Sequence, residues 1–394
     1  MNSVIHLSLT IFALMAWAHA LEMARPFASH MVLPHDVPVP VHGTADAGAE
    51  VTLRCNETRL TTLCGADGTW LVTLPAMKPS ATPMRFEISS GDKNIVLDDV
   101  LVGEVWLCSG QSNMDFPLQR ATGAAQALKA PASTLIRFCS LTGLATSTQA
   151  FRESDRARLR EDASFEGTWQ APAILDRGAL SAVAWWFAEQ RQRDVDMPIG
   201  IVENAVGGSG TEAWLSREIL KSRAEYADFL TPKWMDHPKI SAWAQQRARQ
   251  QTQKLGACPH PFQPGFLYQS GISWWRDFPF TAVLWYQGET NAEIPDVAWN
   301  ARLLEDLITS WRDGLRQPAL PFFLIDLPRI GGQDPLRQHW PLYREAQRRA
   351  VAQTRHAYRI ASMDLGWDSP DVHPPDKKPL ALRAAAEVKK QWPQ

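Results

Sequence analysis

From residue 101 onward, short apolar segments alternate with segments of helical periodicity, and this alternation restricts the fold more than any other feature of the chain. It is typical of a layered α/β domain, in which helices cover both faces of a mostly parallel sheet. Leu303, Leu307 and Trp311 recur at helical spacing, and residues 180–192 and 342–353 resemble them. The six segments predicted as strands are residues 102–108, 135–139, 199–204, 281–286, 321–325 and 358–363.

Residues 25–98 have a different pattern. Short runs rich in β-branched and aromatic residues are separated there by Gly, Pro and Asp turns, which favours a small β-sandwich. The predicted organisation is a signal peptide at 1–20, a β-rich N-terminal module at 21–98 and an α/β domain at 99–394, with insertions near 145–176 and 221–264.

The first twenty residues resemble a secretory signal peptide. An apolar run ends in Ala18-His19-Ala20, an A-x-A cleavage pattern, and no charged side chain precedes Glu22. The alternative is an uncleaved membrane anchor, but the run is short for a span of ~20 residues. We therefore expect a periplasmic or secreted protein without stable membrane insertion after cleavage.

Charge and cysteine content exclude several classes of protein. There are 40 Lys and Arg against 42 Asp and Glu, so no basic field attracts nucleic acid. Of the five cysteines, Cys55 and Cys64 flank what resembles a hairpin turn and form a plausible disulfide pair. No Cys-x-x-Cys and no Cys/His cluster with zinc spacing occurs. The 17 tryptophans could fill the core or contact sugar rings, and composition alone does not decide.

The first segment with chemical content follows the predicted strand at 102–108. This strand runs into Gly110, Gln111, Ser112 and Asn113. In open parallel sheets, ligands bind beyond the carboxyl ends of strands, so the Ser112 hydroxyl is expected at the mouth of the sheet. The alternative is that Ser112 only caps a helix.

Three further strand ends add complementary groups. Residues 199–204 lead into a glycine-rich turn with Gly207 and Gly208, whose bare amides could approach a ligand. Residues 281–286 lead into Gln287, and Asp371 and His373 follow the last predicted strand. A hydroxyl nucleophile, amide donors and a base with a nearby carboxylate are the groups that acyl transfer needs.

These segments resemble a known family. Gly-Gln-Ser-Asn-Met at 110–114, Gly-Gly-Ser-Gly-Thr-Glu-Ala-Trp at 207–214, Trp-Tyr-Gln-Gly-Glu-Thr-Asn-Ala at 285–292 and Asp-Val-His-Pro-Pro-Asp-Lys at 371–377 resemble the sialate O-acetylesterase-like carbohydrate esterases of the SGNH hydrolase superfamily. The resemblance covers nearly the whole mature chain. It implies a flavodoxin-like three-layer α/β/α esterase domain with a small β-sandwich-like N-terminal module, and removal of acetyl groups from sugar hydroxyls.

The resemblance also implies roles for single residues. Ser112 matches the nucleophile and His373 the general base. The amides of Ser112 and of the Gly207–Gly208 turn match oxyanion donors, with the Gln287 side chain as a third. The remaining residues assigned to the pocket are Gln111, Asn113, Glu289 and Asn291.

The residue that orients His373 stays open. In the wider superfamily the motif is Asp-x-x-His, which would require the carboxylate at position 370, where this chain has Pro370. In the sialate-esterase branch the motif is Asp-[Ile/Val]-His-Pro, and Asp371 stands at its first position here. Asp371 is the prediction, and Asp368 or a backbone carbonyl are the alternatives. Each would fix the imidazole tautomer through Nδ1–H.

The predicted function is a serine carbohydrate O-acetylesterase that uses no metal or organic cofactor. Its expected substrates are O-acetylated sialic acid or acetylated plant-wall xylan and xyloglucan. The carboxylate of a sialic acid would favour an arginine in the pocket, and the sequence does not show which arginine lies there. The rival functions are a non-catalytic glycan-binding protein with an inherited fold and, more weakly, a metal-dependent hydrolase. Oligomeric state is not predicted.

Overall fold

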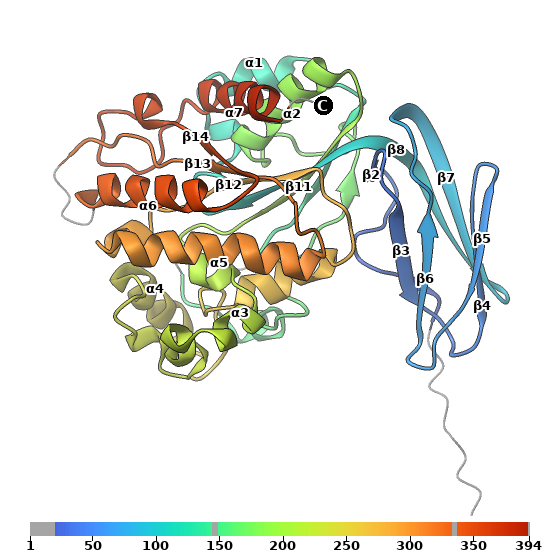
Figure 1. Ribbon diagram of the computed structural model, residues 1–394, viewed down its shortest axis with the longest axis horizontal. Coiled ribbons are helices and arrows are strands. Elements are labelled where there is room, and N and C mark those ends of the chain that lie inside the picture. Colours follow the sequence, from blue (N-terminus) through green and yellow to red (C-terminus); the bar gives the residue numbers. More distant parts are fainter. Residues whose placement is uncertain (1–19, 144–148, 333–336, 393–394) are drawn as a thin grey trace, which may run out of the picture.

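The computed structural model describes residues 20–143, 149–332 and 337–392, in which one long strand joins two β-rich regions (Figure 1). This strand is β8 (Lys93–Gly110). Its first half pairs with the N-terminal strands and its second half lies in the C-terminal sheet. The predicted domain boundary at 98/99 therefore falls within a continuous strand. Residues 1–19 of the predicted signal peptide lie outside the described residues.

The N-terminal region consists of a three-stranded antiparallel sheet and a mostly antiparallel group of strands that continues through β8 into the C-terminal sheet. In β6, Trp70, Val72 and Leu74 are buried and alternate with exposed residues, the pattern of a strand that covers a core with one face. One sheet contains β1 (Glu22–Met23), β3 (Val39–Thr44) and β6 (Thr69–Leu74). The other contains β4 (Glu50–Cys55), β5 (Thr58–Leu63), β7 (Ser80–Ser90) and the start of β8, while β2 (Val32–Pro34) pairs with β8 in parallel.

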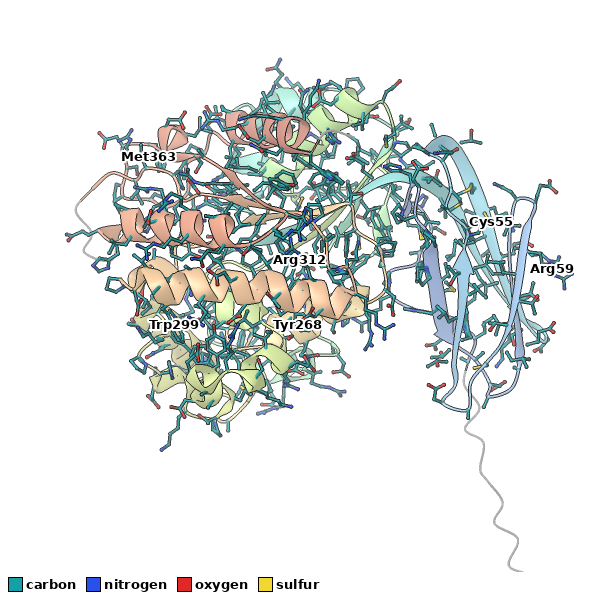
Figure 2. All side chains as sticks on the ribbon, viewed as in Figure 1. Cys55, Arg59, Tyr268, Trp299, Arg312 and Met363 are labelled. Atoms are coloured by element: carbon teal, nitrogen blue, oxygen red, sulfur yellow. The ribbon has the colours of Figure 1, made fainter. Side chains whose placement is uncertain are left out.

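Cys55 and Cys64 are both free thiols, so the predicted disulfide is wrong. The β4–β5 hairpin explains why. Cys55 pairs with Thr58 at the turn, whereas Cys64 follows Leu63, which pairs with Glu50 at the open end. Five residues of strand separate the two ends, or ~16 Å, and a disulfide needs Cα atoms within ~7 Å. Figure 2 shows Cys55 among the strands of the N-terminal region.

The C-terminal sheet contains six parallel strands in the order β9-β11-β8-β12-β13-β14, with β10 antiparallel at the edge beside β9. All six strands predicted from the apolar segments are present. Their bounds, apart from β8, are β9 (Ile136–Ser140), β11 (Ile199–Ala205), β12 (Ala282–Tyr286), β13 (Phe322–Ile325) and β14 (Ala357–Ile360), and β10 is Trp169–Gln170.

Helices cover both faces of this sheet, which confirms the three-layer α/β/α fold (Figure 1). One face carries α1 (Ala124–Lys129), α2 (Ala182–Val195) and α7 (Lys378–Gln391). The other carries α5 (Val297–Leu315) and α6 (Trp340–Gln353), with α3 (Arg217–Ser222) and α4 (Ala242–Thr252) beyond α5. Ser181 and Asp296 cap the N-termini of α2 and α5, accepting backbone N–H bonds of 3.0 Å each. No helix among the described residues is long and apolar enough to cross a bilayer.

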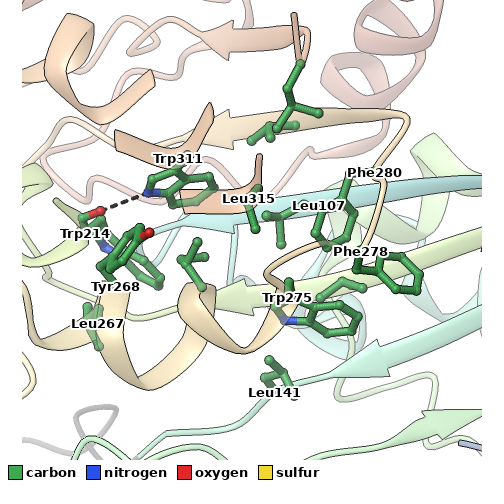
Figure 3. Close-up of a cluster of buried hydrophobic side chains, with 14 of the residues drawn as sticks. Leu107, Leu141, Trp214, Leu267, Tyr268, Trp275, Phe278, Phe280, Trp311 and Leu315 are labelled. Atoms are coloured by element: carbon green, nitrogen blue, oxygen red, sulfur yellow. Dashed lines mark hydrogen bonds between the residues drawn. The ribbon is translucent and has the colours of Figure 1, made fainter. Parts of the chain in front are cut away.

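Most of the tryptophans pack in the core. Figure 3 shows Trp214, Trp275 and Trp311 in one buried cluster. The Trp311 indole donates a 2.8 Å hydrogen bond to the Trp214 carbonyl, which satisfies a polar atom that burial would otherwise leave unpaired. Trp185 and Trp186 in α2 are buried as well.

The strand register brings three strand ends to one place. Gly110 at the end of β8 pairs with Ala205 at the end of β11 and with Tyr286 at the end of β12. The segments that follow these residues therefore start side by side at one edge of the sheet. This edge carries the candidate site.

Candidate active site

A tight turn after β8 presents Ser112. Gly110 has a φ of +144°, and a Cβ atom there would lie 2.0 Å from the Tyr286 carbonyl oxygen, so only glycine fits. The Gln111 N–H donates to that carbonyl over 3.1 Å, and the Gln111 carbonyl accepts from the Asp115 N–H over 3.0 Å. The turn is thereby fixed to the neighbouring strand.

Ser112, His373 and Asp371 form a continuous hydrogen-bonded chain. The Ser112 Oγ lies 2.8 Å from His373 Nε2, and His373 Nδ1 lies 2.8 Å from Asp371 Oδ1. The alternative that Ser112 caps a helix is wrong, because the next α-helix, α1, has Gly123 at its N-cap. The sequence separates Ser112 from His373 by 261 positions, and the fold brings them into contact.

Of the three partners considered for His373, the structure provides Asp371. Its Oδ1 also accepts the His373 backbone N–H over 3.0 Å, so one oxygen holds both the ring and the main chain. Asp368 lies instead against Gly331, where a Cβ atom would come within 2.5 Å of its Oδ1. The Asp371 carbonyl is turned away and accepts a 2.8 Å bond from the Trp367 indole.

The environment of Asp371 favours its ionised form. Partial burial acts to raise the pKa of this carboxyl group, but hydrogen bonds from the His373 ring and main chain outweigh burial, and the net pKa is lowered. An ionised carboxylate at Nδ1 fixes the imidazole tautomer that leaves Nε2 free to accept the serine proton.

Ser112 and Gly207, whose backbone amides were predicted as oxyanion donors, both line the cavity. A Cβ atom on Gly207 would lie 3.4 Å from the Ser112 Cβ, so the glycine-rich turn after β11 is packed directly beside the serine. The N–H groups of Ser112 and Gly207 make no hydrogen bond with any residue that the structure describes. Gly208 has a φ of +79° and fits against Trp243, where a Cβ atom would lie 2.3 Å from the indole. The two free amides are available for an oxyanion.

The structure does not bring the Gln287 side chain to this space, in contrast to the prediction of a third oxyanion donor. Gln287 is fully buried, and its Nε2 lies 2.7 Å from Asn291 Oδ1, 3.1 Å from Gln111 Oε1 and 3.2 Å from the Ser209 carbonyl oxygen. Because Asn291 Oδ1 also accepts the Thr211 N–H over 2.8 Å, the facing group of Gln287 must be its NH₂. Both hydrogens are therefore used inside the protein.

Gln111, Gln287 and Asn291 form a buried amide layer behind the turn. The Asn291 Nδ2 donates to Glu212 Oε2 over 2.9 Å, which extends the layer to the segment after Gly208. Burial raises the pKa of Glu212, and the Asn291 hydrogen bond offsets part of that rise. This layer links the three strand ends to one another.

Asn113 and Glu289 belong to a second buried group, which includes Lys377. Asn113 donates to Glu289 Oε1 and accepts a hydrogen bond from the Lys377 ammonium. Burial lowers the pKa of Lys377 to about 7, against the attraction of Glu289 and Asp371. Burial also raises the pKa of Glu289, whose Oε2 is buried without a hydrogen-bond partner.

A cavity of about 420 Å³ opens in front of these groups. Its lining includes Ser112, Gly207, His373 and Asp371. Part of the wall comes from α4 of the predicted 221–264 insertion. The other lining residues are Gln111, Gly208, Trp243, Arg247, Glu289, Thr290, Glu293, Arg337 and Val372.

Sequence reasoning missed Trp243, Arg247, Arg337 and Lys377. Lys377 had a signal, because it ends the Asp-Val-His-Pro-Pro-Asp-Lys segment. Trp243 and Arg247 lie one helical turn apart on α4 within the predicted insertion, and no motif marks them. Within the described ranges, no group of three or more His, Cys, Asp or Glu side chains is placed to hold a metal ion.

Comparisons with known proteins show to which family the chain is similar. Residues 102–382 match the family model described as carbohydrate esterase, sialic acid-specific acetylesterase. The sialate O-acetylesterase of Rattus norvegicus is 28% identical over 382 residues, covering 86% of this chain and 67% of that protein. The human sialate O-acetylesterase is 27% identical over 372 residues, covering 86% of this chain and 64% of that protein.

A solved structure resembles the chain over nearly its full length. The crystal structure of a carbohydrate acetylesterase from Xanthomonas citri is 27% identical, with a TM-score of 0.74, and the match covers 94% of this chain and 75% of that one. The chain thus spans about two thirds of the curated relatives compared above and three quarters of this structural relative.

Proposed function

The chain belongs to the carbohydrate esterase family of sialic acid-specific acetylesterases, a family of carboxylic ester hydrolases, and we propose that it removes acetyl groups from sugar hydroxyls through an acyl-enzyme on Ser112. One observation carries the proposal. The hydrogen-bonded chain Ser112–His373–Asp371 ends on a cavity next to two unpaired backbone amides. This is the arrangement required for nucleophilic acyl transfer.

In the proposed mechanism, the Ser112 Oγ attacks the acetyl carbonyl carbon while His373 Nε2 takes the hydroxyl proton. The carbonyl oxygen becomes an oxyanion that the N–H groups of Ser112 and Gly207 stabilise. Collapse of this intermediate breaks the ester bond, and His373 gives its proton to the departing sugar oxygen. A water molecule, deprotonated by His373, then attacks the carbonyl carbon of the acetyl-serine. The bond to Ser112 Oγ breaks, His373 returns the proton to this oxygen, and acetate leaves.

Asp371 assists both half-reactions. Each tetrahedral intermediate forms together with an imidazolium at His373, and the adjacent carboxylate stabilises this positive charge. Since the pKa of Asp371 is lowered, the carboxylate is present throughout the neutral pH range. No step of the proposed mechanism draws on a metal ion or organic cofactor.

Trp243, which lines the same cavity as Ser112, supports a sugar as the substrate. Trp243 is 36% exposed and is the exposed tryptophan among the described residues. Its ring lies against Phe262 with centroids 6.1 Å apart, and the Arg247 guanidinium lies 4.8 Å from its centroid. An apolar ring flanked by a fixed polar group suits a sugar, which has both C–H faces and hydroxyls.

Among acetylated sugars, we place O-acetylated sialic acid first. Arg247 and Arg337 both line the cavity, and a guanidinium suits the carboxylate of an acidic sugar. The two curated relatives compared above carry the name sialate O-acetylesterase. The second candidate is acetylated xylan or xyloglucan, in which this carboxylate is missing.

Export through the segment at 1–20 is also part of the proposal, and N-terminal sequencing of the mature protein from the native host tests it.

Acetate release across O-acetylated sialosides, acetylated xylan and acetylated xyloglucan tests the function and ranks the substrates. Ser112→Ala should lose ~10⁵–10⁶ in kcat on every substrate that the wild type cleaves. Equal activity of wild type and Ser112→Ala on p-nitrophenyl acetate would reject Ser112 as nucleophile. Glycan binding without acetate release would favour the non-catalytic alternative, and loss of turnover after exhaustive chelation would favour a metal-dependent hydrolase.

A further inference from the structure

The Asn113 side chain joins the serine turn to two other segments of the site. It is fully buried and follows Ser112 in sequence. Its Nδ2 donates to the Val372 carbonyl oxygen over 2.8 Å and to Glu289 Oε1, and its Oδ1 accepts from Lys377 Nζ. Val372 immediately precedes His373, so the Asn113 amide holds the main chain that carries the imidazole.

The two partners determine the orientation of this amide. A carbonyl oxygen can only accept a hydrogen bond, and an ammonium group can only donate one. The Val372 carbonyl therefore requires the Nδ2 side of Asn113, and the Lys377 ammonium requires the Oδ1 side. An amide flip would set Asn113 Oδ1 against the Val372 oxygen and would break both hydrogen bonds.

Lys377 is placed to keep the amide in this orientation. The residue is 1% exposed, and its ammonium lies 4.8 Å from the Phe116 ring centroid and 5.7 Å from that of Tyr286. Aromatic faces attract a cation but offer no lone pairs for hydrogen bonding, so Asn113 Oδ1 is its oxygen partner in this pocket. Burying an ammonium is costly, which argues for a function at this position.

We propose that Lys377 is a positioning residue that, by fixing the Asn113 amide, holds the Val372–His373 main chain and sets the imidazole against the Ser112 hydroxyl. The proposal rests on the serine esterase mechanism given above. Other hydrogen bonds near His373 join residues within the same segment. The Trp367 indole donates to the Asp371 carbonyl, and the Asp371 N–H donates to Ser369 Oγ. The Asn113 bond ties the segment to the serine turn.

The charge of Lys377 adds a second consequence. The acidic groups that attract it are Glu289 and Asp371, and His373 also interacts with Glu289. A buried positive charge in this group opposes uptake of a further proton by the triad. Removing the charge should therefore make proton uptake easier and move the acid limb of the activity profile to higher pH.

The test compares Lys377→Met, which keeps the apolar stem, with Lys377→Arg, which keeps the charge and the donors. With p-nitrophenyl acetate, we expect Lys377→Met to lower kcat by ~10–100-fold with KM changed by less than ~threefold, the pattern of a misplaced catalytic group. Lys377→Arg should recover most of the loss. The midpoint of the acid limb of kcat/KM should rise in Lys377→Met, which a purely structural role would not cause. The exposed neighbour Lys378 gives the matched control, and Lys378→Met should behave as wild type.

Two outcomes would overturn the proposal. One is a folded Lys377→Met with kcat within ~twofold of wild type, and the other is a Lys377→Arg no more active than Lys377→Met. If Lys377→Met does not fold, Lys377→Gln decides, since its amide can donate to Asn113 without a charge. Because Lys377→Gln keeps the donor and loses only the charge, KM and most of kcat should be retained while the midpoint of the acid limb rises. An unchanged midpoint, or a kcat lowered as far as expected for Lys377→Met, would reject the proposal. Ser112→Ala, measured alongside, reports separately on the esterase mechanism.

Discussion

The turn that carries Ser112 separates two regions of opposite character. On its open side, Asp371, His373 and Trp243 line a cavity, and the Asp371 side chain is 53% exposed. On its buried side, Gln287 is inaccessible to solvent and makes hydrogen bonds to four or more partners. In the proposed mechanism, the groups that react or contact substrate lie on the open side, and the buried side holds them in position. Substitutions on the open side should therefore change activity alone, and substitutions on the buried side should change stability as well.

The largest effect on activity, after loss of Ser112 itself, is expected at Asp371. Asp371→Asn should lower kcat by ~10²–10⁴, because the amide no longer stabilises the imidazolium or fixes its tautomer. Its midpoint of urea unfolding should match that of wild type, since the side chain is half exposed. Asp368→Asn is the control and should change kcat by less than ~threefold. The reverse ranking would refute the assignment of Asp371.

Gln287 tests the buried side. Gln287→Leu should lower the free energy of unfolding by about 2–4 kcal/mol, because it leaves the buried partners of Gln287 without their hydrogen bonds. Activity per folded molecule should fall too as the turn loosens. Gln317 offers a matched control at the other end of β12, where its amide bonds the Phe280 N–H and carbonyl over 3.0 and 2.9 Å. Gln317→Leu should reduce stability and leave activity unchanged. Unfolding curves and kcat, measured for both variants, show whether loss of activity is specific to Gln287.

Substitution of Trp243 should lower activity on acetylated glycans but not on a small ester without a sugar. Trp243→Leu should lower kcat/KM on the acetylated glycan by about tenfold, or ~1.4 kcal/mol, and leave p-nitrophenyl acetate within ~threefold. Trp243→Phe, which keeps a ring, should retain most of the glycan activity. The Glu293 carboxylate accepts bonds from the Ser241 hydroxyl over 2.6 Å and the Trp243 N–H over 3.3 Å, so the helix start stays fixed in both variants. Equal losses on both substrates would exclude a sugar-binding role.

The smallest effect is a change of stability with pH at Glu203, which lies in β11 on the buried side. Burial and the nearby Asp115 raise the pKa of Glu203 to about 8, and hydrogen bonds from Ser181 and Ser140 offset only part of that rise. A carboxyl group whose pKa is raised by folding contributes stability at low pH and loses it as pH rises toward the folded-state value. The free energy of unfolding of Glu203→Gln relative to wild type should therefore increase by about 1 kcal/mol or more between pH 5 and 8.

The partly exposed Glu345 provides the control for this pH effect. Hydrogen bonds from Arg348 and Arg349 lower its pKa to about 2, so it is ionised in both folded and unfolded states above pH 5. The difference between Glu345→Gln and wild type should stay constant from pH 5 to 8. A constant difference for Glu203→Gln as well would mean that Glu203 is ionised in the folded protein at pH 5.

The parts of the fold predicted correctly are those with local signals. Apolar runs of strand length predicted all six parallel strands, and the helical spacing of Leu303, Leu307 and Trp311 predicted α5. The start of β8 was predicted at 102, yet the strand begins at Lys93, because pairing with β7 extends it and such pairing depends on residues distant in sequence. The Cys55–Cys64 disulfide failed for the same reason, since the register of the hairpin decides which residues meet.

The candidate site divides in the same way. By itself, the sequence determined which residue types end the strands: a glycine that admits the turn, a serine, a glycine pair, and an Asp–Val–His segment. Only the tertiary structure decided that Asp371 rather than Asp368 reaches the imidazole, that Gln287 is buried in the protein, that Trp243 lines the cavity in front of Ser112, and that Lys377 bonds Asn113. The physical reason is that strand and turn preferences act over a few neighbouring residues. Hydrogen-bond partners and burial, in contrast, arise from packing between segments up to 264 positions apart.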